Sequence, residues 1–169
     1  MEIESYVDGI TGTAEQEEAR ETAIRRISVA LEEQYPGCEV NAFGSYAERL
    51  HLPDGDLDLT LNCPNSYIWE NATMELVGEY LASAGVVKNV EYVLGARIPV
   101  IKFTDSQTDI DVDLSFNNRE PLLHVPLVQQ YVHEMPALRP LVMVLKTLFS
   151  EKELNKGSTG GLGSYPLVP

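Results

Sequence analysis

Hydrophobic residues recur at helical spacing near the start of the chain, between two clear end signals. From Ile24 to Leu31 an apolar residue returns every three or four positions, which is the period of an amphipathic helix. Thr13 and Gln16 have the spacing of a capping box, which marks a helix start, and Pro36 stops the pattern. The sequence therefore predicts a long helix between Thr13 and Pro36 that covers one face of a sheet.

A different period follows, in which apolar and polar residues alternate. Leu57, Leu59 and Leu61 take every second position, with Asp58 and Thr60 between them, as expected of a strand with one buried face. Comparable patterns predict strands at residues 38–43, 57–63, 91–94, 98–104 and 109–116. Helical spacing predicts further helices at residues 66–84, 122–133 and 138–154. The order of these elements indicates an α/β (α+β) fold, a mixed sheet of about five strands covered by helices.

The length of the chain and its lack of targeting signals narrow the picture. Its 169 residues suffice for one domain of ordinary size. It has no apolar run long enough to span a membrane, and Glu2 and Glu4 stand where a signal peptide would be basic. Residues 1–8 have the pattern of a short amphipathic lead-in. These features predict an intracellular protein without a membrane partner.

The cysteines and histidines follow no recognisable pattern. Cys38 and Cys63 have neither the spacing of a disulfide framework nor that of a zinc site, so we expect two buried free thiols. His51, His124 and His133 are scattered, and we expect them to be ordinary structural or surface residues.

The net charge of −14 bears on any interaction with nucleic acid. Affinity for RNA depends largely on Lys and Arg side chains that neutralise phosphates. The charge therefore argues against tight RNA binding by this chain alone, and an RNA-binding protein partner could supply the missing basic surface.

Aspartates gather at two places in the pattern. Asp56 and Asp58 share one face of the predicted strand, and Asp109, Asp111 and Asp113 share one face of the last strand. Carboxylates crowded beside a core are costly unless a cation joins them, and Mg²⁺ prefers such hard oxygen ligands. The pattern predicts a metal site, although a polar hairpin edge would also explain the first pair.

Three further segments stand out, and the first of them is a candidate for binding phosphate. Gly44 lets a phosphate approach the backbone, and Ser45 offers a hydroxyl and an N–H, although this pair is also common in turns. Lys146 lies at the edge of an apolar helix face, where a free ammonium is costly unless the side chain extends outward to water. The glycine-rich residues 157–165 would in isolation pass for a flexible linker.

Three long stretches together carry a family resemblance. They read AFGSYAERLHLPDGDLDLTL, ARIPVIKFTDSQTDIDVDLSFNN and LRPLVMVLKTLFSEKELNKGSTGGLGSY. In order and spacing they resemble the polymerase-beta-type nucleotidyltransferases, and among these the poly(A) polymerases of the nuclear RNA-surveillance (TRAMP) type and the terminal uridylyltransferases. The resemblance covers nearly the whole chain.

The resemblance implies a two-metal site that uses Mg²⁺ or Mn²⁺. It implies transfer of a nucleoside monophosphate from ATP or UTP to an RNA 3′ end with release of pyrophosphate, and a location in the nucleus. The implied metal ligands and catalytic residues are Asp56, Asp58 and Asp113. The implied nucleotide-binding residues are Gly44, Ser45, Lys146, Ser164 and Tyr165, of which Tyr165 would stack on the base.

The resemblance also separates the three aspartates of the last strand. It makes Asp113 the third ligand and the candidate to accept a proton from the RNA 3′-hydroxyl. Asp111 is either a solvated neighbour or a charge that raises the pKa of the cluster, and Asp109 is expected to cap the strand end.

Some positions depart from the family pattern. Ser150 stands where relatives often have a second Lys, and Val125 falls near the place of a ribose-binding Asn. The chain stops soon after Tyr165, so we expect a truncated or split enzyme. By resemblance, residues 1–12 pack on a helical domain, 13–118 form the catalytic domain, and 119–169 begin the truncated helical domain.

Alternatives to an RNA-extending enzyme remain open at this point. One is a nucleotidyltransferase that acts on a small molecule or a protein. Another is a truncated, non-catalytic nucleotide- or partner-binding module, or a scaffold in which the aspartates are a remnant.

Overall fold

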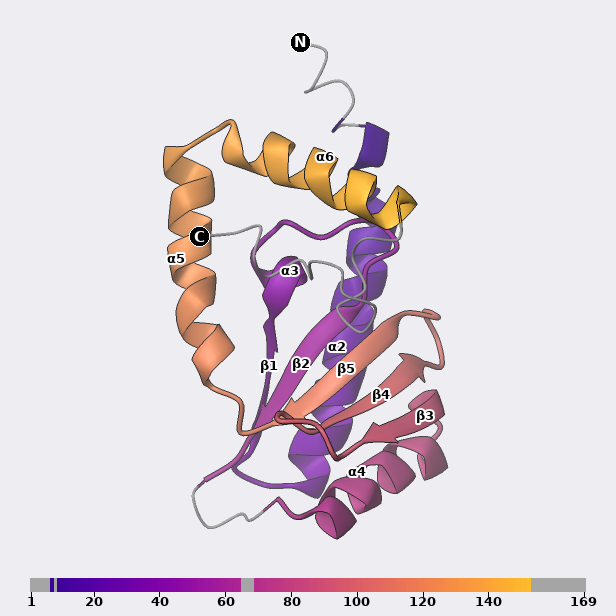
Figure 1. The fold of residues 1–169 in the computed structure, drawn as a ribbon. Helices are drawn as coiled ribbons and strands as arrows, with labels where there is room; N and C mark the ends of the chain where they lie inside the picture. Colours follow the sequence, from indigo (N-terminus) through magenta and orange to yellow (C-terminus); the bar gives the residue numbers. More distant parts are fainter. Residues whose placement is uncertain (1–6, 8, 65–68, 153–169) are drawn as a thin grey trace.

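The computed structural model describes residues 7, 9–64 and 69–152, and its arrangement is shown in Figure 1. The helices are α2 (Ala14–Gln34), α3 (Gly44–Ala47), α4 (Asn71–Ser83), α5 (Glu120–Glu134) and α6 (Leu138–Glu151). The strands are β1 (Glu39–Phe43), β2 (Leu57–Asn62), β3 (Val87–Val93), β4 (Val100–Asp105) and β5 (Asp111–Phe116). They form one sheet in the order β1-β2-β5-β4-β3, in which β2 and β5 are parallel and the other pairs antiparallel. The predicted mixed sheet covered by helices is confirmed.

Helix α2 begins where its capping box predicted. The hydroxyl of Thr13 accepts from the Gln16 N–H at 3.3 Å, and the Gln16 side chain accepts from the Thr13 N–H at 2.9 Å. Both donors are among those that a helix start leaves unpaired, so the box stabilises this end. Figure 1 shows α2 and α4 on the same side of the sheet. Ala23, Ile27 and Leu31 of α2 are fully buried there.

The main core lies between the sheet and these two helices. Leu57, Leu59 and Leu61 of β2 are fully buried, and Leu59 pairs in register with Leu114, which in turn pairs with Ile101. Because side chains alternate across a strand, the residues between these leucines point to the opposite face of the sheet. The core packing therefore decides which face of β2 carries Asp58.

The last two helices cover another part of the molecule. In Figure 1, α5 runs beside β1 and α6 crosses one end of the sheet. A second, small core joins them to the segment after α3, and it consists of Leu50, Val128 and Val142. In the described part of the chain, no helix is both long and apolar enough to cross a bilayer.

Three elements differ most from the pattern-based predictions, whereas β4, β5 and α5 each begin within two residues of the predicted start. Strand β3 begins at Val87, earlier than residue 91, because an irregularity between Lys88 and Glu91 interrupts the alternation and Asn89 is left-handed (φ 56°). Helix α4 begins at Asn71 instead of residue 66, and residues 65–68 lie outside the described residues. Helix α3 was not predicted, since four residues are too few to form an apolar stripe.

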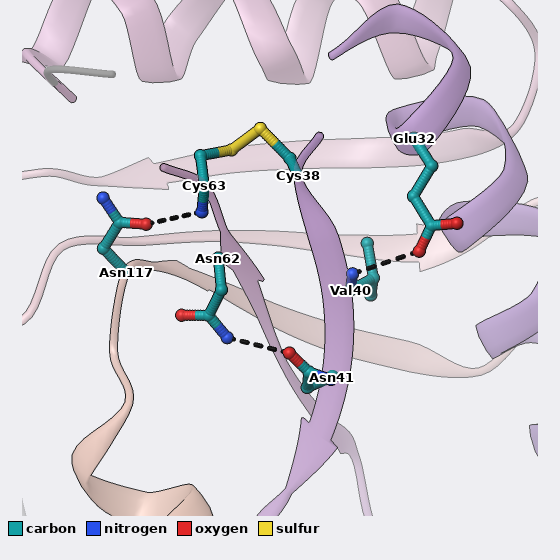
Figure 2. Close-up of a disulfide and its surroundings, with 7 residues drawn as sticks. All are labelled: Glu32, Cys38, Val40, Asn41, Asn62, Cys63 and Asn117. Atoms are coloured by element: carbon teal, nitrogen blue, oxygen red, sulfur yellow. Dashed lines mark hydrogen bonds between the residues drawn. A yellow bond between two sulfur atoms is a disulfide. The ribbon is translucent and has the colours of Figure 1, made fainter. Parts of the chain in front are cut away.

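The prediction of free thiols is wrong. Cys38 and Cys63 form a disulfide with their Cα atoms 4.1 Å apart (Figure 2). Glu39 pairs with Asn62 in the antiparallel β1–β2 ladder, which places the two cysteines opposite each other. Their separation of 25 residues gave no sign of this, because only the strand register brings them together. Figure 2 also shows the Asn117 side chain accepting from the Cys63 N–H at 2.8 Å.

Candidate active site

The three predicted aspartates come together at one end of the sheet. Asp58 on β2 pairs in register with Asp113 on the parallel neighbour β5, and Asp56 directly precedes β2. Asp56 and Asp113 line a cleft of about 690 Å³, together with Ser45, Lys146 and residues of β4. The two parallel strands therefore bring carboxylates that are 55 residues apart in sequence, Asp58 and Asp113, to one place.

Burial and mutual repulsion shift the acidity of these carboxyls. Burial first, and then the charges of Asp56 and Asp113, raise the pKa of Asp58 to about 7. Partial burial and the Asp113 charge also raise the pKa of Asp56, although this side chain remains exposed toward the cleft. Like charges disfavour ionisation of one another, whereas a cation among them would favour it. The three carboxylates therefore lack the positive charge that would stabilise their ionised forms.

Gly44 is required by its contact with one of these carboxylates. Its φ is +62°, and a Cβ added to it would lie 2.2 Å from Oδ2 of Asp58. Any side chain at this position would displace Asp58, and the left-handed backbone adds strain for other residues. Ser45 follows at the start of α3 and lines the cleft. The structure thus places the predicted Gly-Ser pair beside the aspartates.

Lys102 is a cation of this site that the sequence analysis did not identify. Its ammonium makes an ion pair with the Asp113 carboxylate, and the two residues are register partners on β4 and β5. Burial alone would lower the pKa of Lys102, but the hydrogen bond to Asp113 and the charges of Asp113 and Asp56 raise it. The alternation along the predicted strand could have identified Lys102, because Val100, Lys102 and Thr104 share the face opposite Ile101.

Lys146 of α6 lies where its sequence pattern predicted. It is only 8% exposed, lines the cleft and donates to the Leu50 carbonyl at 2.8 Å. Burial lowers the pKa of Lys146, while the charges of Glu48, Asp56 and Asp58 act in the opposite direction. An ammonium with one carbonyl partner at the cleft wall keeps donors for an anion.

Arg20 was also missed. It is 2% exposed, and its Nη2 donates to the Pro53 carbonyl at 2.8 Å and to the Leu52 carbonyl at 3.4 Å. These carbonyls belong to the loop that leads into Asp56, so α2 holds the loop through this guanidinium. Arg20 falls in phase with the buried Ala23 and Ile27, and a charge on a buried stripe was the available signal.

The two remaining aspartates of the last strand have partners outside the carboxylate group. Asp109 precedes β5 with φ 59° and pairs with Lys88, and Asp111 accepts from the Thr104 hydroxyl at 2.8 Å. The turn before β5 is capped by Asp105, whose Oδ2 accepts from the backbone N–H groups of residues 107 and 108. The capping role expected of Asp109 is therefore performed by Asp105.

The carboxylates suit a hard cation chemically, but they are not closed around one. Among the described residues, no group of three or more His, Cys, Asp or Glu side chains is arranged to hold a metal ion. Asp113 is engaged in an ion pair with Lys102. Asp56, Asp58 and Asp113 nevertheless provide the oxygen donors that Mg²⁺ prefers. Ser164 and Tyr165 lie outside the described residues, so their predicted roles remain predictions.

Comparisons with known proteins agree on one family. The family model described as "Poly(A) RNA polymerase, mitochondrial-like, central palm domain" matches residues 1–133. Poly(A) RNA polymerase cid14 of Schizosaccharomyces pombe is 34% identical over 169 residues, which are 99% of this chain and 25% of that protein. The inactive poly(A) RNA polymerase protein Trf4-2 of Drosophila melanogaster is 32% identical over 99% of this chain and 42% of its own length.

Solved structures show the same fold. The polymerase core of TRAMP, a RNA surveillance complex, superposes with a TM-score of 0.85 at 29% identity and covers 98% of this chain and 51% of its own. A mutant of the Cid1 poly(U) polymerase bound to MgATP has a TM-score of 0.85 at 25% identity, over 97% of this chain and 51% of its own. The chain spans about a quarter of the cid14 protein and about half of each solved chain. With the palm-like sheet and its aspartates in place, the chain belongs to the poly(A) RNA polymerase family with the mitochondrial-like central palm domain.

Proposed function

We propose that this chain carries the catalytic site of a template-independent RNA 3′-terminal nucleotidyltransferase. It transfers a nucleoside monophosphate from ATP or UTP to an RNA 3′-hydroxyl and releases pyrophosphate. The observation that carries the proposal is the register pairing of Asp58 with Asp113 on parallel strands, with Asp56 beside them at the cleft. Family membership adds to it, and the raised pKa of Asp58 supports a site built to receive positive charge.

Asp56, Asp58 and Asp113 would hold two Mg²⁺ or Mn²⁺ ions. Bound there, the ions would neutralise the triphosphate and stabilise the charge that develops on the attacking and leaving oxygens. The three carboxylates would hold the ions in position. Gly44 keeps Asp58 in place, because a side chain at residue 44 would displace the Asp58 carboxylate. Together these residues account for most of the rate, because phosphoryl transfer depends on positioning and electrostatic stabilisation.

The cleft wall would bind the nucleotide. Ser45 donates its N–H and hydroxyl to the β- and γ-phosphates, and Lys146 supplies a buried positive charge to the triphosphate. We also propose that Ser164 contacts the phosphates and that Tyr165 stacks on the base. Aromatic stacking tolerates any base, so Tyr165 would not choose between ATP and UTP.

In the reaction, the RNA 3′-oxygen forms a bond to the α-phosphorus of the nucleotide while the bond to the pyrophosphate oxygen breaks. The proton of the 3′-hydroxyl passes to a carboxylate oxygen of Asp113, which lines the cleft and can release it to water. Lys146 lines the cleft and would neutralise part of the charge of pyrophosphate, and the ions held by the carboxylates would neutralise the rest. Residues 13–118 would form this catalytic unit and residues 119–169 the start of a helical domain.

The acidic surface bears on the partners of the protein. With a net charge of −14, the chain has little means of attracting RNA by its own charge. We propose that an RNA-binding protein supplies basic surface next to the cleft, and that the protein acts in the nucleus. RNA affinity should then rise, with a steep salt dependence, when the partner is added.

The test is extension of a labelled RNA oligonucleotide by the 169-residue chain with Mg²⁺ and each nucleoside triphosphate in turn. Asp113→Asn should lower the rate about a thousandfold, since a group that stabilises the transition state is lost. Asp111→Asn, on the same strand and the same face, is the matched control and should stay within about threefold of the wild type. Equal losses in both variants would contradict the assignment of Asp113.

A second candidate function follows from the inactive relative, which is 32% identical to this chain in sequence. The chain would then bind Mg²⁺ and ATP without transferring nucleotide. Calorimetric titration with Mg²⁺-ATP separates the two: binding without extension of any RNA favours the binding module. Transfer to a protein or small molecule but not to RNA would instead indicate another acceptor.

A further inference from the structure

Lys102 makes the ion pair that engages Asp113. It lies on β4, the strand between β5 and β3. Its register partners are Asp113 of β5 and Glu91 of β3. Its ammonium contacts Oδ2 of Asp113, whose side chain is 23% exposed, while the Lys102 side chain is 43% exposed. The lysine is therefore anchored in the sheet while its charge reaches the floor of the cleft.

The charge of Lys102 acts on the whole carboxylate group. Lys102, Asp56 and Asp113 line the same cleft, and Asp58 is the register partner of Asp113, so the ammonium that pairs with Asp113 lies close to all three carboxylates. Three carboxylates at one place repel each other, and an ammonium of fixed position offsets part of that repulsion. Where a divalent cation would sit among these oxygens, the chain already has a positive charge of its own.

We propose that Lys102 stands in for a divalent cation in the metal-free protein and competes with the metal for Asp113. The inference rests on the proposed function, because it assumes that Asp56, Asp58 and Asp113 are the metal ligands. An arriving ion meets two obstacles from Lys102: the Asp113 oxygen is already occupied, and two cations close together repel. Both effects weaken metal binding, so removal of the Lys102 ammonium strengthens it.

The opposite role predicts the opposite result. If Lys102 served only to hold Asp113 in a shape ready for metal, its loss would leave Asp113 free to turn away and metal would bind more weakly. The direction of the change in metal affinity therefore decides between competitor and scaffold. Catalytic rate does not decide, because either role could lower it.

Lys88 offers a matched control. Its ammonium pairs with Asp109 in the same way, but on the neighbouring strand and with partners 45% and 75% exposed. Lys88→Met and Lys102→Met change the net charge equally and each removes one lysine–aspartate pair. They differ in whether the pair includes a proposed metal ligand.

The experiment is titration of the purified 169-residue chain with Mn²⁺, with free Mn²⁺ followed by electron paramagnetic resonance. Lys102→Met should bind Mn²⁺ about tenfold more tightly than the wild type, a change of the size that one nearby charge makes to a carboxylate. Lys88→Met should stay within about twofold. Lys102→Arg, which keeps the charge, should stay near the wild-type affinity.

Two further measurements keep the outcome clear. In an Asp113→Asn background the effect of Lys102→Met should shrink, because the competed oxygen is changed. Lys102→Gln serves if the Met variant does not fold, as judged by circular dichroism. Unchanged or weaker Mn²⁺ binding in the folded Lys102 variants, with measurable wild-type binding, overturns the inference alone. Absence of Mn²⁺ binding in every protein overturns the metal site and the inference with it.

Discussion

At the scale of single residues, the site is a balance of charges held in unfavourable surroundings. Asp58 lies against Gly44 and near Asp56 and Asp113, and its pKa is raised to about 7 by burial and by those carboxylates. Lys102 offsets part of this cost through its ion pair with Asp113. A cluster that is costly in the metal-free protein is expected where function needs it.

The first prediction concerns Asp58 and pH. Its folded pKa of about 7 exceeds the unfolded value of 3.8, so between these values the folded state binds more protons. The contribution of Asp58 to the free energy of unfolding therefore falls as pH rises through this window. Asp58→Asn removes the ionisation. The free energy of unfolding of this variant, relative to that of the wild type, should therefore be about 2 kcal/mol higher at pH 8 than at pH 4. This difference is smaller than the full pKa shift implies, because the side chain is partly exposed.

Urea denaturation of both proteins without metal, at pH 4 and at pH 8, measures this difference. Comparison of the two proteins at each pH cancels the titration of carboxylates remote from Asp58, while the relief of Asp56 and Asp113 belongs to the same effect. A gap between them that does not widen with pH would show that Asp58 ionises normally. The same variant should lose activity, so stability and function move in opposite directions.

At the scale of elements, the loop that leads into Asp56 depends on contacts between segments that are far apart in the chain. Helix α2 holds the Leu52 and Pro53 carbonyls through Arg20, and β2 and β5 align Asp58 with Asp113. The capping box of α2 and the leucine alternation of β2 were readable because both signals are local. Helix α3 could not be predicted, since four residues are too few to show a helical period. The early start of β3 was missed because an irregularity in the strand interrupts the alternation.

The second prediction concerns Arg20. Arg20→Met should lower the free energy of unfolding by about 2 kcal/mol, because hydrogen bonds from a charged donor to two loop carbonyls are lost. Arg25→Met, at an exposed position of the same helix, should change it by less than about 0.5 kcal/mol. Urea denaturation gives both values. Equal stability of the two variants would mean that the loop is held by other contacts.

At the scale of the whole molecule, a disulfide joins the start of β1 to the end of β2. The sequence argument for free thiols considered spacing alone, and spacing does not report that two cysteines face each other across a ladder. The bond closes a loop that contains α3 and the approach to Asp56. It therefore restricts the unfolded chain around the candidate active site.

The third prediction concerns this bond. Reduction should lower the free energy of unfolding by about 3 kcal/mol, the value expected for a closed loop of this length. The measurement is urea denaturation with and without a phosphine reductant. A Cys38→Ala/Cys63→Ala double variant is the control and should not respond. Alkylation of two thiols in the unreduced, denatured protein would instead restore the original expectation of free cysteines.

The sequence by itself determined the elements with a strong local period and the chemical types of the site. The leucine alternation of β2 decided that Asp58 faces away from the core, and the apolar stripe of α6 placed Lys146 at a boundary. Only the tertiary structure decided which distant groups meet: Asp58 with Asp113, Lys102 with Asp113, Arg20 with the loop and Cys38 with Cys63. The physical reason is that period and capping act between near neighbours, whereas strand register and burial bring together residues that no local pattern relates.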